Sequence, residues 1–71
     1  MDYEDKRMLE EHLQYNFIPP VHPSWIEKCI EAIEAYKNAD PDLIIVDYGN
    51  GERETALDII EDLRLDYWIE Q

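Results

Sequence analysis

Two glycines that flank Asn50 form the one arrangement in this sequence that could cradle a phosphate. They follow an apolar run at residues 43–46. A nucleotide-binding loop of the GxxxxGK[ST] type needs a lysine for the phosphates and a hydroxyl for magnesium, and neither follows Gly51. Acidic side chains beside the loop would also repel a phosphate. We therefore interpret Gly49 and Gly51 as the end of one helix and the start of the next. A β-hairpin through Asn50-Gly51 is the alternative.

Nucleophilic catalysis and metal binding have few candidate residues. Cys29, the one cysteine, falls on the apolar side of a predicted helix, where an inert thiol is expected. Neither His12 nor His22 has a companion at the spacing of a zinc site. The carboxylates from Asp58 to Asp62 lack the D-x-D-x-D-G spacing of a calcium loop, so we interpret them as a solvated face. We predict that the protein is not an enzyme, with no catalytic residues, no cofactor and no metal.

The charge of the chain limits the partners that it can bind. The 71 residues include 18 acidic and 6 basic side chains, which gives a net charge of −12. Nucleic acids and anionic membranes bind proteins through lysine and arginine, so we expect no direct contact with either. The segment 52–71 alone contains seven acidic and two basic residues, a net charge of −5. The negative field is therefore expected to concentrate in the C-terminal half.

The same sequence indicates a location and a size class. A single cysteine cannot form an internal disulfide, which fits a reducing compartment. The N-terminus is charged from its second residue, unlike a signal peptide, and no apolar run approaches the roughly 20 residues of a membrane span. We predict a cytoplasmic protein whose residues 1–71 form a single acidic domain.

Helical periodicity predicts an all-α bundle of about four helices. The predicted helices span Asp2 to Tyr15, Trp25 to Asn38, residues 41–48, and Glu52 to Ile69. Ser24 and Glu27 have the spacing of a capping box at the start of the second helix. Its predicted buried stripe consists of Ile26, Cys29, Ile30, Ile33 and Tyr36.

The segment 41–48 permits two interpretations. Asp40 before Pro41 is typical of a helix start, with a capping carboxylate and then proline at the first helical position. The β-branched run that follows favours a strand. In that alternative the fold is α+β, with a small sheet formed by residues 43–48 and 63–69.

The predicted C-terminal helix carries the candidate contact surface. On a helical wheel, Leu65 and Ile69 point outward with the carboxylates, and Trp68 flanks them. The predicted partner-binding residues are Asp58, Glu61, Asp62, Leu65, Trp68 and Ile69. The alternative is that the helix ends near Arg64 and that residues 65–69 fold back to bury their apolar side chains.

Two functions from different classes follow from this surface. Carboxylates four residues apart on a helix lie about 6 Å from each other, which is comparable to successive phosphates of a nucleic-acid strand. We expect an acidic modulator that mimics nucleic acid and occupies a basic groove on a DNA- or RNA-handling protein. Its size and charge are similar to those of small phage and plasmid inhibitors, a similarity of composition only. The alternative is a structural or adaptor protein that forms a homodimer through Leu65, Trp68 and Ile69.

Overall fold

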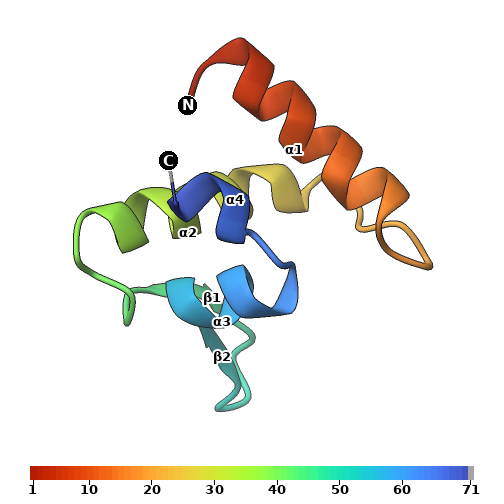
Figure 1. The fold of residues 1–71 in the computed structure, drawn as a ribbon. Coiled ribbons are helices and arrows are strands. Elements are labelled where there is room, and N and C mark those ends of the chain that lie inside the picture. The colour runs from red at the N-terminus through yellow and green to blue at the C-terminus, as the bar shows by residue number, and fades with distance from the viewer. Residues whose placement is uncertain (71) are drawn as a thin grey trace.

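Two long helices form the N-terminal half of the fold, which a computed structural model describes over residues 1–70 (Figure 1). Helix α1 spans Tyr3–Tyr15 and helix α2 spans Trp25–Lys37. Asp2 caps α1, because its Oδ1 accepts the Asp5 amide at 2.9 Å. Both helices were predicted within one residue of these ends. None of the helices in residues 1–70 is long and apolar enough to cross a membrane.

The predicted capping box at the start of α2 is wrong. Ser24 makes no capping hydrogen bond, because its amide donates to Nδ1 of His22 at 3.1 Å and its hydroxyl lies 2.9 Å from the same nitrogen. A capping box does occur at helix α3, which spans Ala56–Asp62. The Asp58 amide donates to Oγ1 of Thr55 at 3.2 Å, and the Thr55 amide donates to Oδ2 of Asp58 at 3.0 Å.

The segment predicted as a helix at 41–48 is a strand instead. Strand β1 (Ile44–Asp47) pairs antiparallel with β2 (Arg53–Thr55), with an irregularity between Ile44 and Val46. The fold is therefore mixed, as in the α+β alternative, although the partner strand is 53–55 and not 63–69. A hairpin partner satisfies the strand amides within a few residues, which a distant partner does only at a greater cost in chain entropy.

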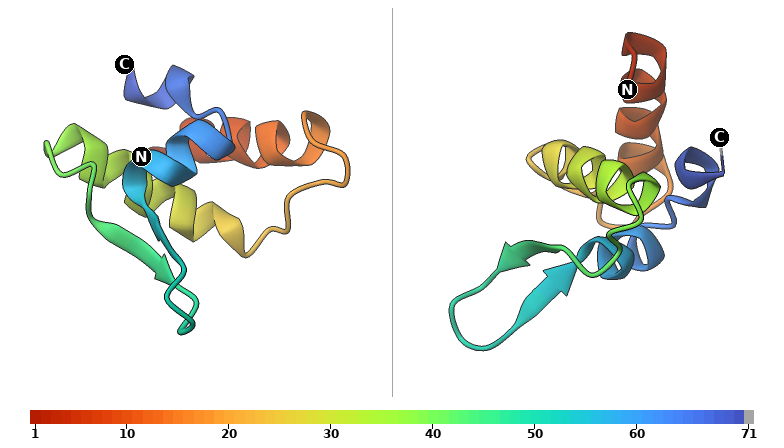
Figure 2. Two further views of the ribbon diagram at one scale, coloured as in Figure 1. Left: turned by 90° about the horizontal axis from the view of Figure 1, so that it is seen from below. Right: turned by 90° about the vertical axis from the view of Figure 1, so that its left-hand side faces the viewer.

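The two glycines form the tip of this hairpin and allow it to turn. Gly49 and Gly51 have φ values of 79° and 89°, a region that other residues rarely adopt. The Tyr48 amide closes the loop on the Glu52 carbonyl at 3.0 Å. The interpretation of these glycines as a helix boundary is therefore wrong, and the hairpin alternative is right. Figure 2 shows the hairpin projecting from the helices.

The predicted helix from Glu52 to Ile69 is broken into β2, α3 and a short helix α4 (Asp66–Ile69). Arg64 has a left-handed φ of 53° and ends α3. The Leu65 amide then donates to the Ile60 carbonyl at 2.9 Å, the long hydrogen bond of a Schellman motif. The chain reverses here, so that residues after Arg64 no longer continue the helical face of α3.

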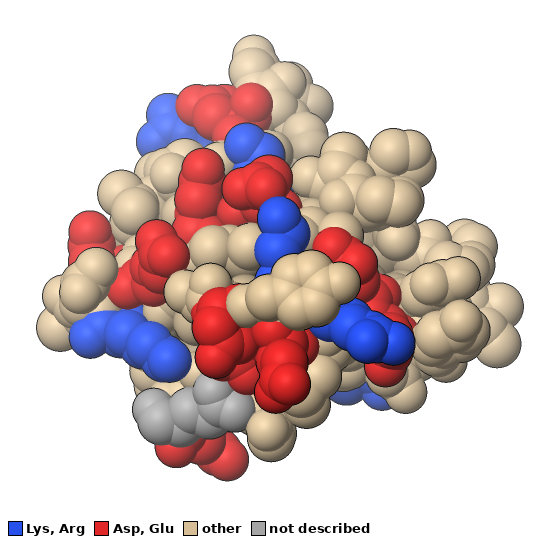
Figure 3. Space-filling model, turned by 90° about the horizontal axis from the view of Figure 1, so that it is seen from above, with Lys and Arg blue, Asp and Glu red and all other residues tan. Residues whose placement is uncertain are grey.

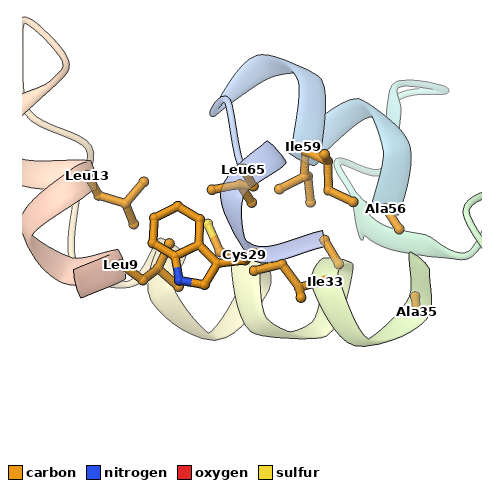
Figure 4. Packing of buried hydrophobic residues seen from close by; sticks show 11 residues of the cluster. Leu9, Leu13, Cys29, Ile33, Ala35, Ala56, Ile59 and Leu65 are labelled. Carbon is orange, nitrogen blue, oxygen red and sulfur yellow. The ribbon is translucent and has the colours of Figure 1, made fainter. Parts of the chain in front are cut away.

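The core lies where α1, α2, α3 and the α3–α4 junction meet. Figure 4 shows Leu9 and Leu13 of α1, together with Ile33 of α2 and Leu65, pointing toward one another. The buried residues are Leu9, Leu13, Cys29, Ala32, Ile33, Ala35, Ala56, Ile59, Ile60, Leu65 and Trp68. Burial raises the pKa of the Cys29 thiol to about 12, so this thiol stays protonated and inert at neutral pH.

The buried face of α2 is rotated from the predicted stripe. Ala32 and Ala35 are buried, whereas Tyr36 is 38% exposed, and Ile26 and Ile30 are only partly buried. Two alanines on the inner face let α3 approach closely, since Ala56 of α3 is also fully buried. Small residues therefore form part of the buried face of α2, the helix that packs against α3.

His12 and Arg64 connect α1 to the α3–α4 junction. Nε2 of His12 donates to the Leu63 carbonyl at 2.8 Å, because a carbonyl oxygen can only accept. Arg64 donates from Nη2 to the Asn16 carbonyl at 2.7 Å, and its guanidinium lies 4.5 Å from the centre of the Phe17 ring. These contacts hold the turn in place although Arg64 has a left-handed backbone.

We expect Ala39→Gly to stabilise the protein by about 0.5–1 kcal/mol. Ala39 has a φ of 60° in a second Schellman motif, where the Asp40 amide donates to the Ala35 carbonyl at 2.9 Å. Glycine adopts this conformation without the steric cost of a Cβ atom. Urea denaturation measures the change, with Ala32→Gly inside α2 as the control. The explanation fails if both substitutions destabilise the protein equally.

Candidate partner-binding surface

Carboxylates of the hairpin and of α3 meet at one cavity, which Glu54 and Asp62 both line. We call these carboxylates, with their neighbours on the exposed side of α3, the acidic surface. Its members are Glu52, Glu54, Asp58, Glu61 and Asp62. Asp58, Glu61 and Asp62 are exposed, as the sequence predicted. Glu52 is exposed and Glu54 is half-buried. These two residues were not among the predicted partner-binding residues, because a continuous helix was predicted from Glu52 onward. The Asn50-Gly51 turn signal was the clue to their position on a hairpin.

The two basic residues of the segment 52–71, Arg53 and Arg64, bind groups outside the acidic surface. Arg53 lies 3.7 Å from a carboxylate oxygen of Asp47, and Arg64 binds the Asn16 carbonyl. Within residues 1–70, no salt bridge reaches the acidic surface. Its charge is therefore not neutralised by the protein itself. Because neither Arg53 nor Arg64 pairs with its carboxylates, these remain available to a cationic partner.

A different face of the molecule carries charges of both signs. Figure 3 views the molecule from above, as it is drawn in Figure 1, and several lysine and arginine side chains lie there among the aspartates and glutamates. The ion pairs on α1 fit this mixture: Arg7 lies 3.6 Å from Glu11, and Lys6 lies 3.9 Å from Glu27 of α2. Exposed pairs of this kind reduce the local field without adding much stability.

Asp58 has a structural role besides its charge. Its Oδ2 accepts the Thr55 amide in the capping box of α3. A capping carboxylate typically contributes about 1 kcal/mol, so a substitution here would disturb the fold. Whether Asp58, Glu61 and Asp62 bind a partner stays a prediction. Glu54, Glu61 and Asp62 are the better residues for testing the role of charge.

The predicted exposure of the apolar residues beside these carboxylates is wrong for two of the three. Leu65 is fully buried, Trp68 is 5% exposed, and Ile69 is half-buried. The Schellman turn at Arg64 reverses the chain and directs Leu65 and Trp68 into the core, as in the fold-back alternative. No exposed patch of these three residues therefore borders the acidic surface.

A cavity of about 260 Å³, which we call the Trp25 cavity, lies beside the acidic surface. Its lining residues are Val21, Trp25, Tyr48, Glu54, Ile59, Asp62 and Leu63. It therefore joins the connector between α1 and α2, the first turn of α2, the hairpin and α3. Apolar side chains, two aromatic rings and two carboxylates meet in one hollow.

Tyr48 and Glu54 are hydrogen-bonded at this cavity. The Tyr48 hydroxyl donates to Oε2 of Glu54 at 2.9 Å. This hydrogen bond raises the pKa of Tyr48 above its ordinary value, and partial burial and the charges of Glu54, Glu52 and Asp62 raise it further. Carboxylates from both the hairpin and α3 therefore lie close enough to Tyr48 to act on its phenol.

We expect Glu54→Gln to lower the pKa of Tyr48 toward its ordinary value of 10.0. The negative charge of Glu54 favours the neutral phenol over the phenolate, so its removal makes ionisation easier. Carbon NMR of the tyrosine rings during an alkaline titration resolves Tyr48 from the other tyrosines. Glu52→Gln is the control and should lower the pKa less, because Glu52 acts through its charge alone. An unchanged Tyr48 in Glu54→Gln would contradict the hydrogen bond.

Within residues 1–70, no three histidine, cysteine, aspartate or glutamate side chains gather in a way that could hold a metal ion. Comparison with known proteins gave no match: no family model, no curated protein and no solved structure matches this chain.

Proposed function

We propose that the protein is an acidic modulator that binds a basic groove on a protein that handles DNA or RNA, in the place of the nucleic acid. The observation that carries this proposal is the acidic surface, whose carboxylates come from both the hairpin and α3. Their charge is not neutralised, because Arg53 pairs with Asp47 and Arg64 binds Asn16. Such a surface attracts lysine- and arginine-lined grooves.

The arrangement of the carboxylates supports mimicry of a nucleic-acid strand. Asp58 and Asp62 are one helical turn apart, so their side chains leave α3 about 6 Å from each other. The hairpin adds Glu54, which lines the same cavity as Asp62. Charges on a short, capped helix such as α3 lose little entropy when a partner binds.

Affinity capture from a cell lysate with added duplex DNA or RNA tests the proposal. Proteins that the wild type retains should be nucleic-acid-binding proteins, and the added nucleic acid should displace them. A variant with Glu54→Gln, Glu61→Gln and Asp62→Asn should retain much less. The matched control, with Glu10→Gln, Glu31→Gln and Glu34→Gln, removes the same charge elsewhere. Retention that nucleic acid does not affect would contradict the proposal.

The alternative function, an adaptor that dimerises through Leu65, Trp68 and Ile69, has lost its main support. Leu65 and Trp68 belong to the hydrophobic core. A dimer through these side chains would require α4 to leave the core and expose them to solvent. We therefore do not propose this function.

A further inference from the structure

We propose that the Trp25 cavity receives an arginine side chain of the basic partner protein. This inference rests on the proposed function, because it assigns the chemical group through which a basic partner engages the acidic surface. The cavity offers carboxylates, an indole ring and apolar side chains within one hollow of about 260 Å³. A guanidinium on its aliphatic stem needs this combination.

The carboxylates of the cavity are available to a cation. The Tyr48 hydroxyl binds Oε2 of Glu54 and fixes the orientation of this carboxylate. Oε1 of Glu54 has no hydrogen-bond partner among residues 1–70, and neither carboxylate oxygen of Asp62 has one in the same range. Two acceptors on neighbouring elements can therefore bind the forked donors of one guanidinium.

The aromatic and apolar lining favours arginine over lysine. Trp25 is half-buried and lines the cavity, so its ring position is restricted by packing. A planar guanidinium stacks on an indole and is more weakly hydrated than an ammonium group, so it enters a partly apolar hollow at a lower desolvation cost. Val21, Ile59 and Leu63 can contact the methylene groups of the arginine stem.

Titration with a short peptide of alternating arginine and glycine tests the assignment, with a lysine–glycine peptide of the same length for comparison. In amide and indole NMR spectra, the arginine peptide should shift the signals of Trp25, Tyr48 and Asp62 most. It should also bind more tightly than the lysine peptide. No binding of the arginine peptide, or shifts spread evenly over all acidic residues, would overturn the inference.

Two matched variants separate the cavity from the overall charge. Glu54→Gln with Asp62→Asn should weaken binding of the arginine peptide about tenfold, since it removes both charged acceptors. Glu31→Gln with Glu34→Gln removes the same charge from the outer face of α2 and should change the affinity by about twofold at most. Equal losses of affinity in the two variants would overturn the arginine site in the Trp25 cavity. They would leave the proposed function standing, since the overall negative charge of the protein would then explain binding.

A change at the indole tests the stacking itself. Trp25→Leu should weaken the binding of the arginine peptide about two- to fivefold and should affect the binding of the lysine peptide less. Circular dichroism checks that this variant is folded, and the carboxylate variants test the cavity if it is not. The two proposals can also fail separately. If the arginine peptide binds in the cavity but nucleic acid does not displace the captured proteins, the partner is not a nucleic-acid-handling protein, and the arginine site still stands.

Discussion

Trp68→Ala is expected to lower the free energy of unfolding by about 3–5 kcal/mol. Trp68 is 5% exposed, and its ring lies 5.2 Å from that of His12 in an edge-on arrangement. Its removal would leave a cavity between α1, α2 and α4. Small domains have total stabilities of about 5–15 kcal/mol, so this one substitution would remove much of the stability.

Two further variants make this expectation specific. Tyr67→Ala changes the neighbouring aromatic residue, which is 52% exposed, and should cost about 1 kcal/mol or less. Trp68→Phe keeps most of the apolar area and removes an indole N–H that has no hydrogen-bond partner within residues 1–70, so it should cost less than Trp68→Ala. Urea denaturation measures all three. Similar losses for Trp68→Ala and Tyr67→Ala would show that Trp68 is not a core residue.

The second large effect is expected on association with the captured partner. The variant with Glu54→Gln, Glu61→Gln and Asp62→Asn should reduce the association rate about 10- to 100-fold at low salt. Exposed charges act over the Debye length, which falls to about 8 Å at physiological ionic strength, so the wild-type rate should decrease steeply with salt. The dependence of the variant on salt should be weaker, because fewer charges remain to be screened.

Stopped-flow measurements over a range of salt concentrations provide this comparison. The control variant with Glu10→Gln, Glu31→Gln and Glu34→Gln has the same net charge, so any larger effect of the first variant is due to the position of the charges. None of these six side chains makes a hydrogen bond that holds a helix end in residues 1–70. If both variants slow association equally, net charge alone determines the rate, and the acidic surface is not the contact.

Several elements of the fold could be predicted from local sequence. Helices α1 and α2 have regular apolar periodicity and strong helix formers, so the sequence predicted their ends within a residue. The exposure of Asp58, Glu61 and Asp62 was also predictable, because charged side chains are rarely buried without a partner. These features depend on interactions within a few residues.

Other elements depended on competition between two local signals. Asp40-Pro41 is typical of a helix start, yet the β-branched residues that follow paired with 53–55 once the Gly49–Gly51 turn allowed a hairpin. Likewise, the helical pattern from 52 to 69 permitted either a continuous helix or an end near Arg64, and it did not indicate the left-handed conformation of that residue. Arginine rarely adopts this conformation, and here contacts with Asn16 and Phe17 hold it.

The sequence by itself determined the net charge, the two long helices and the exposure of the α3 carboxylates. Only the tertiary structure decided which charges lie together and which apolar residues are hidden. The hairpin brought Glu52 and Glu54 to α3 and created the Trp25 cavity, while the turn at Arg64 buried Leu65 and Trp68. The physical reason is that periodicity defines the faces of one helix, whereas a single turn with positive φ redirects every residue after it, and long-range packing holds that turn in place.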